Sequence, residues 1–240
     1  MDDRERKKRP IVTYLLLASA ALIQLYVSIV PTPEALRVYE AYSLFPVRLF
    51  DGVGVEALVT YIFLHGGWLH FFVNAIALWG AGSIVEREIG HVRYVLVYLS
   101  SGVAAGLAHS FLNMSSSIPL VGSSGAIFGV IAVLFLLMPF KITFALIVPL
   151  PAVLVGIMLS AVTFSAVWLS ADGIVAHQSH LGGFIFGCLW AFTFDRRRAL
   201  KGLIVAAMVF AILYYLGCLL YTSDAADEGL GVDLGGRRII

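Results

Sequence analysis

Histidine, serine and asparagine side chains recur in three otherwise hydrophobic stretches of the sequence. These stretches are HGGWLHFFVNAIALWG at 65–80, VGSSGAIFG at 121–129 and AHQSHLGGFIFG at 176–187. A polar side chain in such surroundings is costly without a partner and therefore marks a candidate functional site. Together the three stretches offer a hydroxyl, imidazoles and an amide, which are the groups used in nucleophilic acyl transfer.

The spacing of glycines indicates which hydroxyl and which imidazole would meet. The second and third stretches each carry a G-x-x-x-G pair, Gly125 with Gly129 and Gly183 with Gly187. Such pairs allow two helix backbones to approach closely. If the two grooves face each other, Ser124 comes within hydrogen-bond reach of His180, as an activated nucleophile requires. The alternative is that Ser124 is a helix N-cap with only a local role.

The first stretch supplies candidate donors for an oxyanion site. His70 and Asn74 are four residues apart and so share a helix face. The backbone N–H of Ser124, at the start of a helix, would be a third donor. His70 and Asn74 could alternatively serve as hydrogen-bond links between helices. We expect His65 to tie the preceding loop to the helix start, and His177 to face the outer aqueous cavity.

A metal site is a second possible use of these histidines. His65, His70, His177 and His180 would have to gather around one zinc ion. The sequence has no H-E-x-x-H motif, and its hydrophobic spans supply no carboxylate ligand or general base. An aspartyl protease needs two membrane-embedded aspartates, and none lies inside a span. We therefore expect no metal and no cofactor.

The elements that carry these residues are predicted to be membrane helices. The chain has 240 residues, of which 60% are hydrophobic and 13% are charged, against roughly 45–50% and 25% in soluble domains. Long uncharged runs, each near or above the ~20 residues that span a bilayer, suggest about seven membrane helices. The runs cover 11–30, the stretch from Trp68 to Val85, 94–112, 118–140, 142–170, 173–194 and 202–221.

The placement of basic residues predicts the orientation of these helices. If the N-terminus is cytoplasmic, most Lys and Arg residues face the cytoplasm, as the positive-inside rule expects. These residues are Arg4, Arg6, Lys7, Lys8, Arg9, Arg87, Arg93, Lys141, Arg196, Arg197, Arg198 and Lys201. The three polar stretches then lie at similar depth, toward the outer leaflet. We expect a multi-pass integral membrane protein, and the short basic N-terminus without a transit-type leader favours a prokaryotic plasma membrane.

Short connections between the runs predict sequential antiparallel helices and an all-α helical bundle. The expected organisation is a basic cytoplasmic N-terminus at 1–10, a core of six membrane helices at 11–195 and an additional membrane helix at 196–221. An outer loop at 31–64, rich in aromatic residues, either lies in the headgroup layer or caps the helix ends. The polar tail at 222–240 is expected to be disordered or a sequencing artefact.

At this point the motifs resemble those of the rhomboid-family intramembrane serine proteases. The family's H-x-x-x-x-H-x-x-x-N is matched by His65, His70 and Asn74, and its G-x-S-G by residues 122–125. Its histidine followed by small residues is matched by His180, Gly182, Gly183 and Gly187. The resemblance covers roughly residues 10–195, with all motif blocks in the family's order.

The resemblance implies a role for each matched position. Ser124 would be the nucleophile and His180 its general base, without an acidic third member. Phe128 falls where the family carries an aromatic ring that packs against the catalytic histidine, and Gly122 and Gly125 flank the serine pair. Ser123 stands where alanine is common in the family.

The implied function is endoproteolysis within the membrane. The enzyme would cleave transmembrane helices of membrane proteins near the outer leaflet, so its partners would be transmembrane protein substrates and the lipid bilayer, with no nucleic acid. One alternative is a catalytically silent rhomboid-like protein that binds membrane clients. Another is a transporter with a histidine proton relay, but the inner halves of the spans are almost wholly apolar and no internal repeat is evident.

Overall fold

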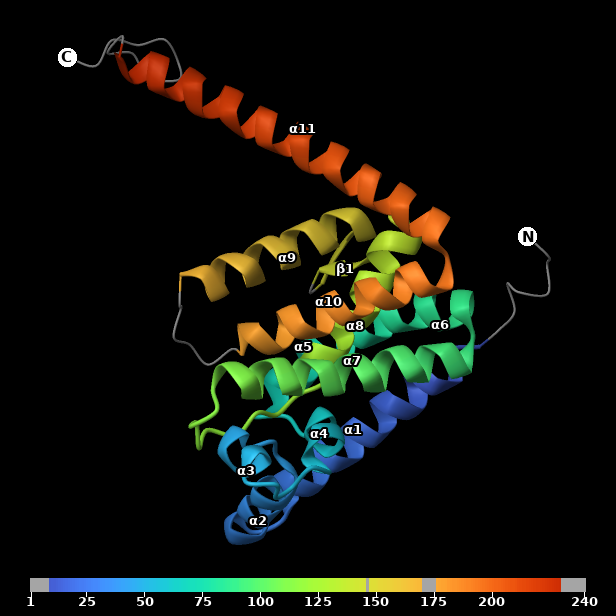
Figure 1. Ribbon diagram of the computed structural model, residues 1–240, viewed down its shortest axis with the longest axis vertical. Helices are drawn as coiled ribbons and strands as arrows, with labels where there is room; N and C mark the ends of the chain where they lie inside the picture. The colour runs from blue at the N-terminus through green and yellow to red at the C-terminus, as the bar shows by residue number, and fades with distance from the viewer. Residues whose placement is uncertain (1–8, 146, 170–175, 230–240) are drawn as a thin grey trace.

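The computed structural model describes residues 9–145, 147–169 and 176–229 as a bundle of helices with one short β-hairpin (Figure 1). The predicted helical bundle is confirmed. Residues 1–8, the predicted outer connection at 170–173 and the tail residues 230–240 lie outside the described residues.

The first half of the chain forms helix α1 and then a series of short helices in the predicted outer loop. α1 covers Ile11–Ile29. The loop contains α2 (Thr32–Tyr42), α3 (Pro46–Phe50), α4 (Ala57–Thr60) and the 3-10 helix η2 (Tyr61–Phe63). These loop helices cluster at the end of the molecule where α1 finishes (Figure 1). The second predicted span is a continuous helix made of α5 (Trp68–Ala77), the π-helical turn η3 (Leu78–Gly82) and α6 (Ser83–Ile89).

The second half of the chain supplies the centre of the bundle. α7 (His91–Leu112), α8 (Ser124–Leu137) and α10 (His177–Phe194) pack against one another, with α9 (Ala152–Trp168) beside them (Figure 1). α8 is the most enclosed element. Every one of its residues is buried except Ser124 and Phe128, which are four apart and therefore share a face. The surface of α8 is thus partly exposed at this one position.

Four helices are long and apolar enough to cross a membrane by length and composition. They are Ile11–Ile29, Trp68–Ile89, His91–Leu112 and Arg196–Cys218. The other three predicted spans lie in shorter or more polar helices. α8 has 14 residues, or ~21 Å of helix, which is less than a hydrocarbon thickness of ~30 Å.

The prediction of one span over 142–170 is wrong in its first third. Ile142–Ala145 and Val148–Pro151 form an antiparallel hairpin, β1 and β2, in which Ile142 pairs with Pro151. β-branched residues favour strands, and the two prolines of β2 cannot donate helical hydrogen bonds. The helix α9 therefore begins only at Ala152, directly after Pro151.

Helix α11 covers Arg196–Gly229 and continues without a break past the expected boundary at 221. Its first turns pack on α8, α9 and α10, with Gly202 against the backbone of Leu136 in α8, and the rest extends away from the bundle (Figure 1). Residues 222–229, within the predicted tail, are thus helical. Their alanine, aspartate and glutamate residues are compatible with a helix.

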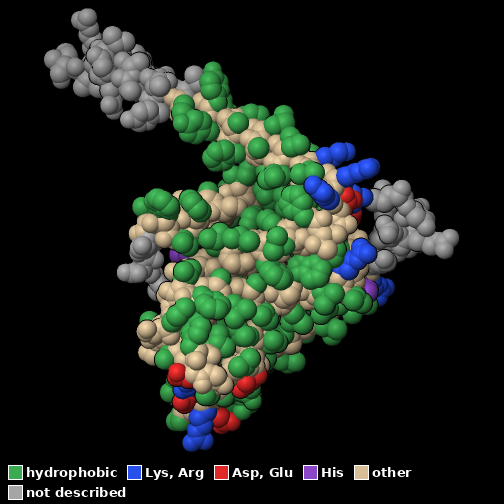
Figure 2. Space-filling model, in the orientation of Figure 1, with side chains coloured by type: hydrophobic (Ala, Val, Ile, Leu, Met, Phe, Trp, Pro, Cys, Tyr) green, Lys and Arg blue, Asp and Glu red, His purple; other side chains and the backbone are tan. Residues whose placement is uncertain are grey.

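Charged side chains lie at two ends of the molecule, with a broad apolar surface between them. Lys and Arg gather where α11 begins, and a mixed group of charges lies around α2 (Figure 2). We call the first of these the basic end. It contains Arg87, Arg93, Lys141 and residues 196–201 among the described residues.

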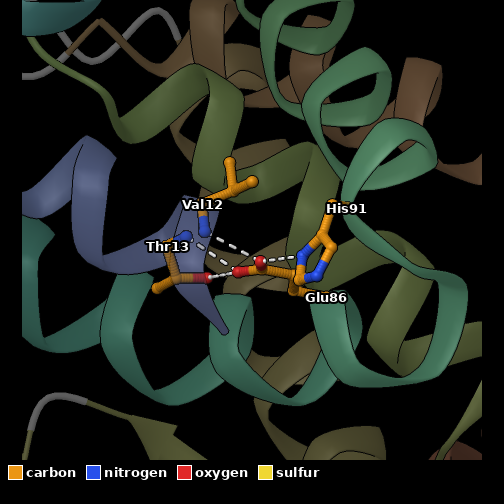
Figure 3. Close-up of polar contacts among 4 residues, drawn as sticks. All are labelled: Val12, Thr13, Glu86 and His91. Carbon is orange, nitrogen blue, oxygen red and sulfur yellow. Dashed lines mark hydrogen bonds and ion pairs between the residues drawn. The ribbon is translucent and has the colours of Figure 1, made fainter. Parts of the chain in front are cut away.

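A buried carboxylate fixes α1 to α6 and α7 at the basic end (Figure 3). Glu86 accepts hydrogen bonds from the N–H groups of Val12 and Thr13, at 2.8 and 2.7 Å, and from the Thr13 hydroxyl at 2.7 Å. His91 Nδ1 lies 2.6 Å from Glu86 Oε1, the oxygen that also accepts the Val12 N–H. Glu86 therefore satisfies N–H groups that the first turn of α1 leaves unpaired, which explains how a fully buried carboxylate is tolerated there.

Candidate active site

The side chains of Ser124 and His180 meet between α8 and α10, at the partly exposed position on α8. His180 Nε2 lies 2.8 Å from Ser124 Oγ, within hydrogen-bond distance. The ring of Phe128, one turn further along α8, stacks on the His180 ring with centroids 4.2 Å apart and planes 9° apart. Phe128 therefore sets the plane of the imidazole, so that its Nε2 points at the serine hydroxyl.

Close contact between α8 and α10 makes this meeting possible. A Cβ atom built on Gly183 would overlap the carbonyl oxygen of Gly125, and one on Gly187 would overlap that of Gly129. The two G-x-x-x-G pairs therefore face each other, as the glycine spacing predicts. Without side chains between them, the helix backbones are in direct contact. Ser124 and His180 lie next to the Gly125–Gly183 contact, on the side where α8 and α10 begin.

An extended segment before α8 positions Ser124, and the sequence did not reveal how it is held. Leu44 and Leu120 form a two-way backbone bridge, with N···O distances of 3.1 and 2.8 Å. The N–H of Gly122 donates to the carbonyl of Tyr61 at 3.0 Å. The loop at 31–64 thus anchors the chain immediately before Ser124, which supports its expected role as a cap over the helix ends.

Gly122 is required both by its backbone and by its neighbour. Its φ of +119° lies in a region that side-chain-bearing residues rarely adopt. A Cβ at this position would also lie 2.7 Å from Cε1 and 2.8 Å from Nε2 of His70. The His70 ring therefore lies directly against the backbone that leads into Ser124.

The hydrogen bonding of His70 leaves one ring nitrogen as a donor toward this backbone. His70 Nδ1 accepts the N–H of Gly66 at 3.3 Å. In the neutral imidazole the proton then resides on Nε2, which is the nitrogen beside Gly122. His70 thus presents an N–H next to the start of α8, as an oxyanion donor must.

Asn74 is buried, and its amide bonds to the backbone of its own helix. Its Nδ2 donates to the backbone carbonyl of His70, four residues earlier on the same helix, at 2.9 Å. An amide NH2 group has two donors, so this bond fixes the orientation of the amide and leaves its second N–H available.

His65 and Ser123 form a separate pair next to the site. His65 Nε2 lies 3.2 Å from Ser123 Oγ, and the His65 ring packs edge-on against His70 at 5.2 Å between centroids. Tyr39 of α2 donates its hydroxyl to the His65 carbonyl at 2.6 Å. This arrangement agrees with a structural role for His65. It also turns the Ser123 hydroxyl toward His65, so that only the hydroxyl of Ser124 bonds to His180.

The buried environment of His65 predicts a dependence of stability on pH. Burial, with the adjacent His70, lowers the pKa of His65 from 6.5 to about 4. The unfolded chain therefore takes up a proton at this position well before the folded protein does. Its contribution to stability is complete above pH 6.5 and falls as the pH drops toward 4, by about 2–3 kcal/mol.

Unfolding in detergent between pH 7.5 and pH 4.5 tests this expectation. The variant His65→Gln cannot titrate, and its stability should fall less over this range than that of the parent. Equal losses in parent and variant would show that His65 is not responsible.

The four histidines proposed as an alternative metal site do not form one. Within the described residues, no group of three or more His, Cys, Asp or Glu side chains is arranged to hold a metal ion. His177 instead lies edge-on to His180, with centroids 6.1 Å apart, one turn nearer the start of α10. Within the residues that the structure describes, no hydrogen bond or ion pair joins His180 to a carboxylate.

Several known proteins with rhomboid names are similar to this chain. Rhomboid protease GluP of Bacillus subtilis (strain 168) is 31% identical over 166 residues, which are 66% of this chain and 31% of that protein. RHOMBOID-like protein 1 of Arabidopsis thaliana is 35% identical over 148 residues, 58% of this chain and 34% of that protein. Rhomboid protein 1, mitochondrial, of Saccharomyces cerevisiae is 26% identical over 143 residues, 56% and 40% of the two chains. The chain thus spans about a third of the length of the first two relatives.

A family model provides the assignment. The model described as the Rhomboid domain matches residues 54–197, which is more than half of the chain. The match begins in the outer loop, includes all three polar stretches and ends where α10 gives way to α11. The chain is therefore an integral membrane protein that belongs to the rhomboid family.

Proposed function

We propose that this chain is an intramembrane serine endopeptidase in which Ser124 and His180 form a catalytic dyad. The observation that carries the proposal is the 2.8 Å contact between His180 Nε2 and Ser124 Oγ at the one open place on α8. A hydroxyl is a weak nucleophile unless a base takes its proton, and this contact puts a base in reach. Relatives named as proteases support the same chemistry.

The reaction would proceed through an acyl-enzyme. Ser124 Oγ attacks the carbonyl carbon of the peptide bond while its proton passes to His180 Nε2. When the tetrahedral intermediate collapses, the C–N bond breaks and the same proton goes to the leaving amine. A water molecule, deprotonated in turn by His180, then hydrolyses the ester and restores the Ser124 hydroxyl.

Phe128 would do part of the work of the missing acidic residue. In a Ser-His-Asp triad the aspartate holds the imidazole in the correct orientation. Here the stacked Phe128 ring fixes the plane of His180 instead. An aromatic ring does not stabilise the imidazolium as a carboxylate does, so a slow chemical step is expected.

The oxyanion would be held by donors from α5 and α8. His70 Nε2 lies beside Gly122, two residues before Ser124, whose N–H is one of those that the first turn of α8 leaves unpaired, and the positive end of the α8 dipole adds to their effect. Asn74 would join them through its second amide N–H, while the first stays bonded to the carbonyl of His70. Removal of one such donor costs on the order of a hundredfold in rate.

The substrate would be a transmembrane helix that unwinds near its outer end. Peptide bonds in a helix are shielded by their own hydrogen bonds, so residues that weaken helices, such as glycine and proline, should favour cleavage. The short helix α8 supports such a site: if its last residue lies at the inner surface of the hydrocarbon core, ~21 Å of helix in a core of ~30 Å would leave Ser124 below the outer surface. Water can then reach the acyl-enzyme from the outer side.

Covalent labelling of the purified protein in liposomes tests the nucleophile. A fluorophosphonate probe is expected to label the parent on Ser124 and to leave Ser124→Ala unlabelled. Ser123→Ala is the matched control, because its hydroxyl faces His65 and its loss should leave labelling intact. Equal labelling of Ser124→Ala would refute the proposed nucleophile. No labelling of the parent, together with no cleavage of a transmembrane substrate, would favour the catalytically silent client-binding protein.

A further inference from the structure

A cavity of about 550 Å³ opens at the basic end, away from the dyad. Its wall is formed by α1, the η3–α6 part of the second span and the hairpin. Tyr14, Trp79, Ile142 and Phe144 give it an apolar interior, and Trp79 stacks on Phe144 with centroids 5.7 Å apart. No residue of the candidate active site lines this cavity.

Two cations at the cavity have no anionic partner among the described residues. Arg87 and Lys141 both line it, and neither forms an ion pair within 9–145, 147–169 and 176–229. Among the residues that the structure describes, the acidic side chain that lines the cavity is Glu88, and its carboxylate is bound by Arg198 of α11 at 2.7 Å. This part of the chain therefore leaves the positive charge of Arg87 and Lys141 uncompensated at the rim of the cavity.

An apolar groove continues from this cavity along the side of the bundle. It lies between α1 and α5 and shares Trp79 with the cavity. Leu17, Ala18, Phe71, Phe72 and Ile76 line it, with no charged residue among its lining. The two hollows together form one amphipathic track, basic at one end and apolar along the rest.

The first part of the track lies within the depth of one bilayer leaflet. Trp79 precedes Arg87 by eight residues, or ~12 Å along the helix. The hydrocarbon of one leaflet is about 15 Å deep, half of the ~30 Å core. A molecule with its charge at Arg87 would therefore have its acyl chain beside Trp79.

We propose that this track binds an anionic glycerophospholipid, with the phosphate between Arg87 and Lys141 and one acyl chain in the α1–α5 groove. Basic pockets between membrane helices on the cytoplasmic side are suited to anionic headgroups, and the charge pattern predicts that this end faces the cytoplasm. The bound lipid would join α1, α6 and the hairpin at a place where protein contacts leave a cavity. The site is independent of the proposed proteolysis.

Quenching of Trp79 fluorescence by brominated lipids measures this binding directly. The full chain is reconstituted in phosphatidylcholine bilayers that contain either dibrominated phosphatidylglycerol or dibrominated phosphatidylcholine at equal mole fractions. Subtraction of the signal of Trp79→Phe isolates Trp79 from the other tryptophans. We expect the anionic lipid to bind beside Trp79 about fivefold or more tightly than the zwitterionic one, since each nearby cation contributes about that factor.

Two double variants separate a site from general attraction to the basic end. Arg87→Gln with Lys141→Gln should lower the preference for phosphatidylglycerol to about one. Arg197→Gln with Lys201→Gln removes the same charge from exposed positions on α11 that do not line the cavity, and should keep the preference. The proposal is wrong if the parent shows no preference, if the first variant retains it, or if both variants lose it equally.

A substitution in the groove tests the placement of the acyl chain. Ala18→Leu fills the groove on α1 without changing any charge. It should reduce quenching of Trp79 by brominated phosphatidylglycerol relative to the parent. Unchanged quenching in Ala18→Leu would overturn the proposed position of the chain.

Discussion

Alanine at Ser124 or at His180 is expected to lower the rate of peptide-bond cleavage by about 10⁴-fold or more, and the double variant to lose no more than either single one. Residues that act as one catalytic unit show this strong non-additivity, because removal of either partner already abolishes the shared step. The direct Nε2···Oγ contact makes the two side chains such a unit. Cleavage of a transmembrane substrate in liposomes, measured under single-turnover conditions, gives the rates.

The neighbours of the dyad provide its controls. His177→Ala removes an imidazole one turn from His180 that has no hydrogen bond to Ser124, and its effect should stay within about tenfold. Losses that simply multiply in the Ser124→Ala and His180→Ala double variant would mean that the two residues act separately. That result would contradict the dyad even if each single variant were slow.

Much of the fold followed from the sequence because the bilayer makes strong physical demands. Uncharged runs must form helices that satisfy their own hydrogen bonds, and the four longest helices coincide with predicted runs. The facing glycine pairs of α8 and α10 were predictable for a similar reason. Two helices can touch along their backbones only where side chains are absent, so the spacing of Gly125, Gly129, Gly183 and Gly187 indicated both the contact and its register.

Other features depend on contacts between distant segments and were not predictable from local patterns. The bridge between Leu44 and Leu120, which anchors the chain before Ser124, involves two residues of ordinary hydrophobic type. The hairpin at 142–151 replaces a helix although its residues are as apolar as those of a span. The prolines at 149 and 151 were the available signal. Hydropathy includes them in a long uncharged run, but prolines lack the N–H groups that donate the hydrogen bonds of a helix interior.

Side-chain hydrogen bonds were the least predictable part of the candidate site. The pattern of the sequence placed His70 and Asn74 on one helix face, but it did not reveal that Asn74 bonds to the backbone of its own helix. Likewise, it did not reveal that His65 forms a hydrogen bond with the hydroxyl of Ser123. Each of these bonds is one of several that the same groups can make, and the choice depends on tertiary packing.

Gly183→Ala is expected to destabilise the protein by about 3 kcal/mol or more and to separate the dyad. The added methyl would overlap the carbonyl oxygen of Gly125, a backbone atom that cannot turn aside as a flexible side chain can. α8 and α10 would have to move apart, and overpacking of a close interface costs typically 1–3 kcal/mol even where side chains give way. Because Ser124 is the residue next to Gly125 in the chain, its distance to His180 would increase as the helices separate.

The same substitution elsewhere in the chain shows that the effect belongs to the helix contact. Gly217 lies in α11, and a methyl group added there would meet no atom within 4 Å, so Gly217→Ala should be neutral or stabilise the helix by up to ~1 kcal/mol. Unfolding of both variants in detergent gives the stabilities, and labelling of Ser124 by the fluorophosphonate probe reports the state of the dyad. If Gly183→Ala unfolds at the same point as Gly217→Ala and retains its labelling, then direct backbone contact between α8 and α10 is not what holds Ser124 and His180 together.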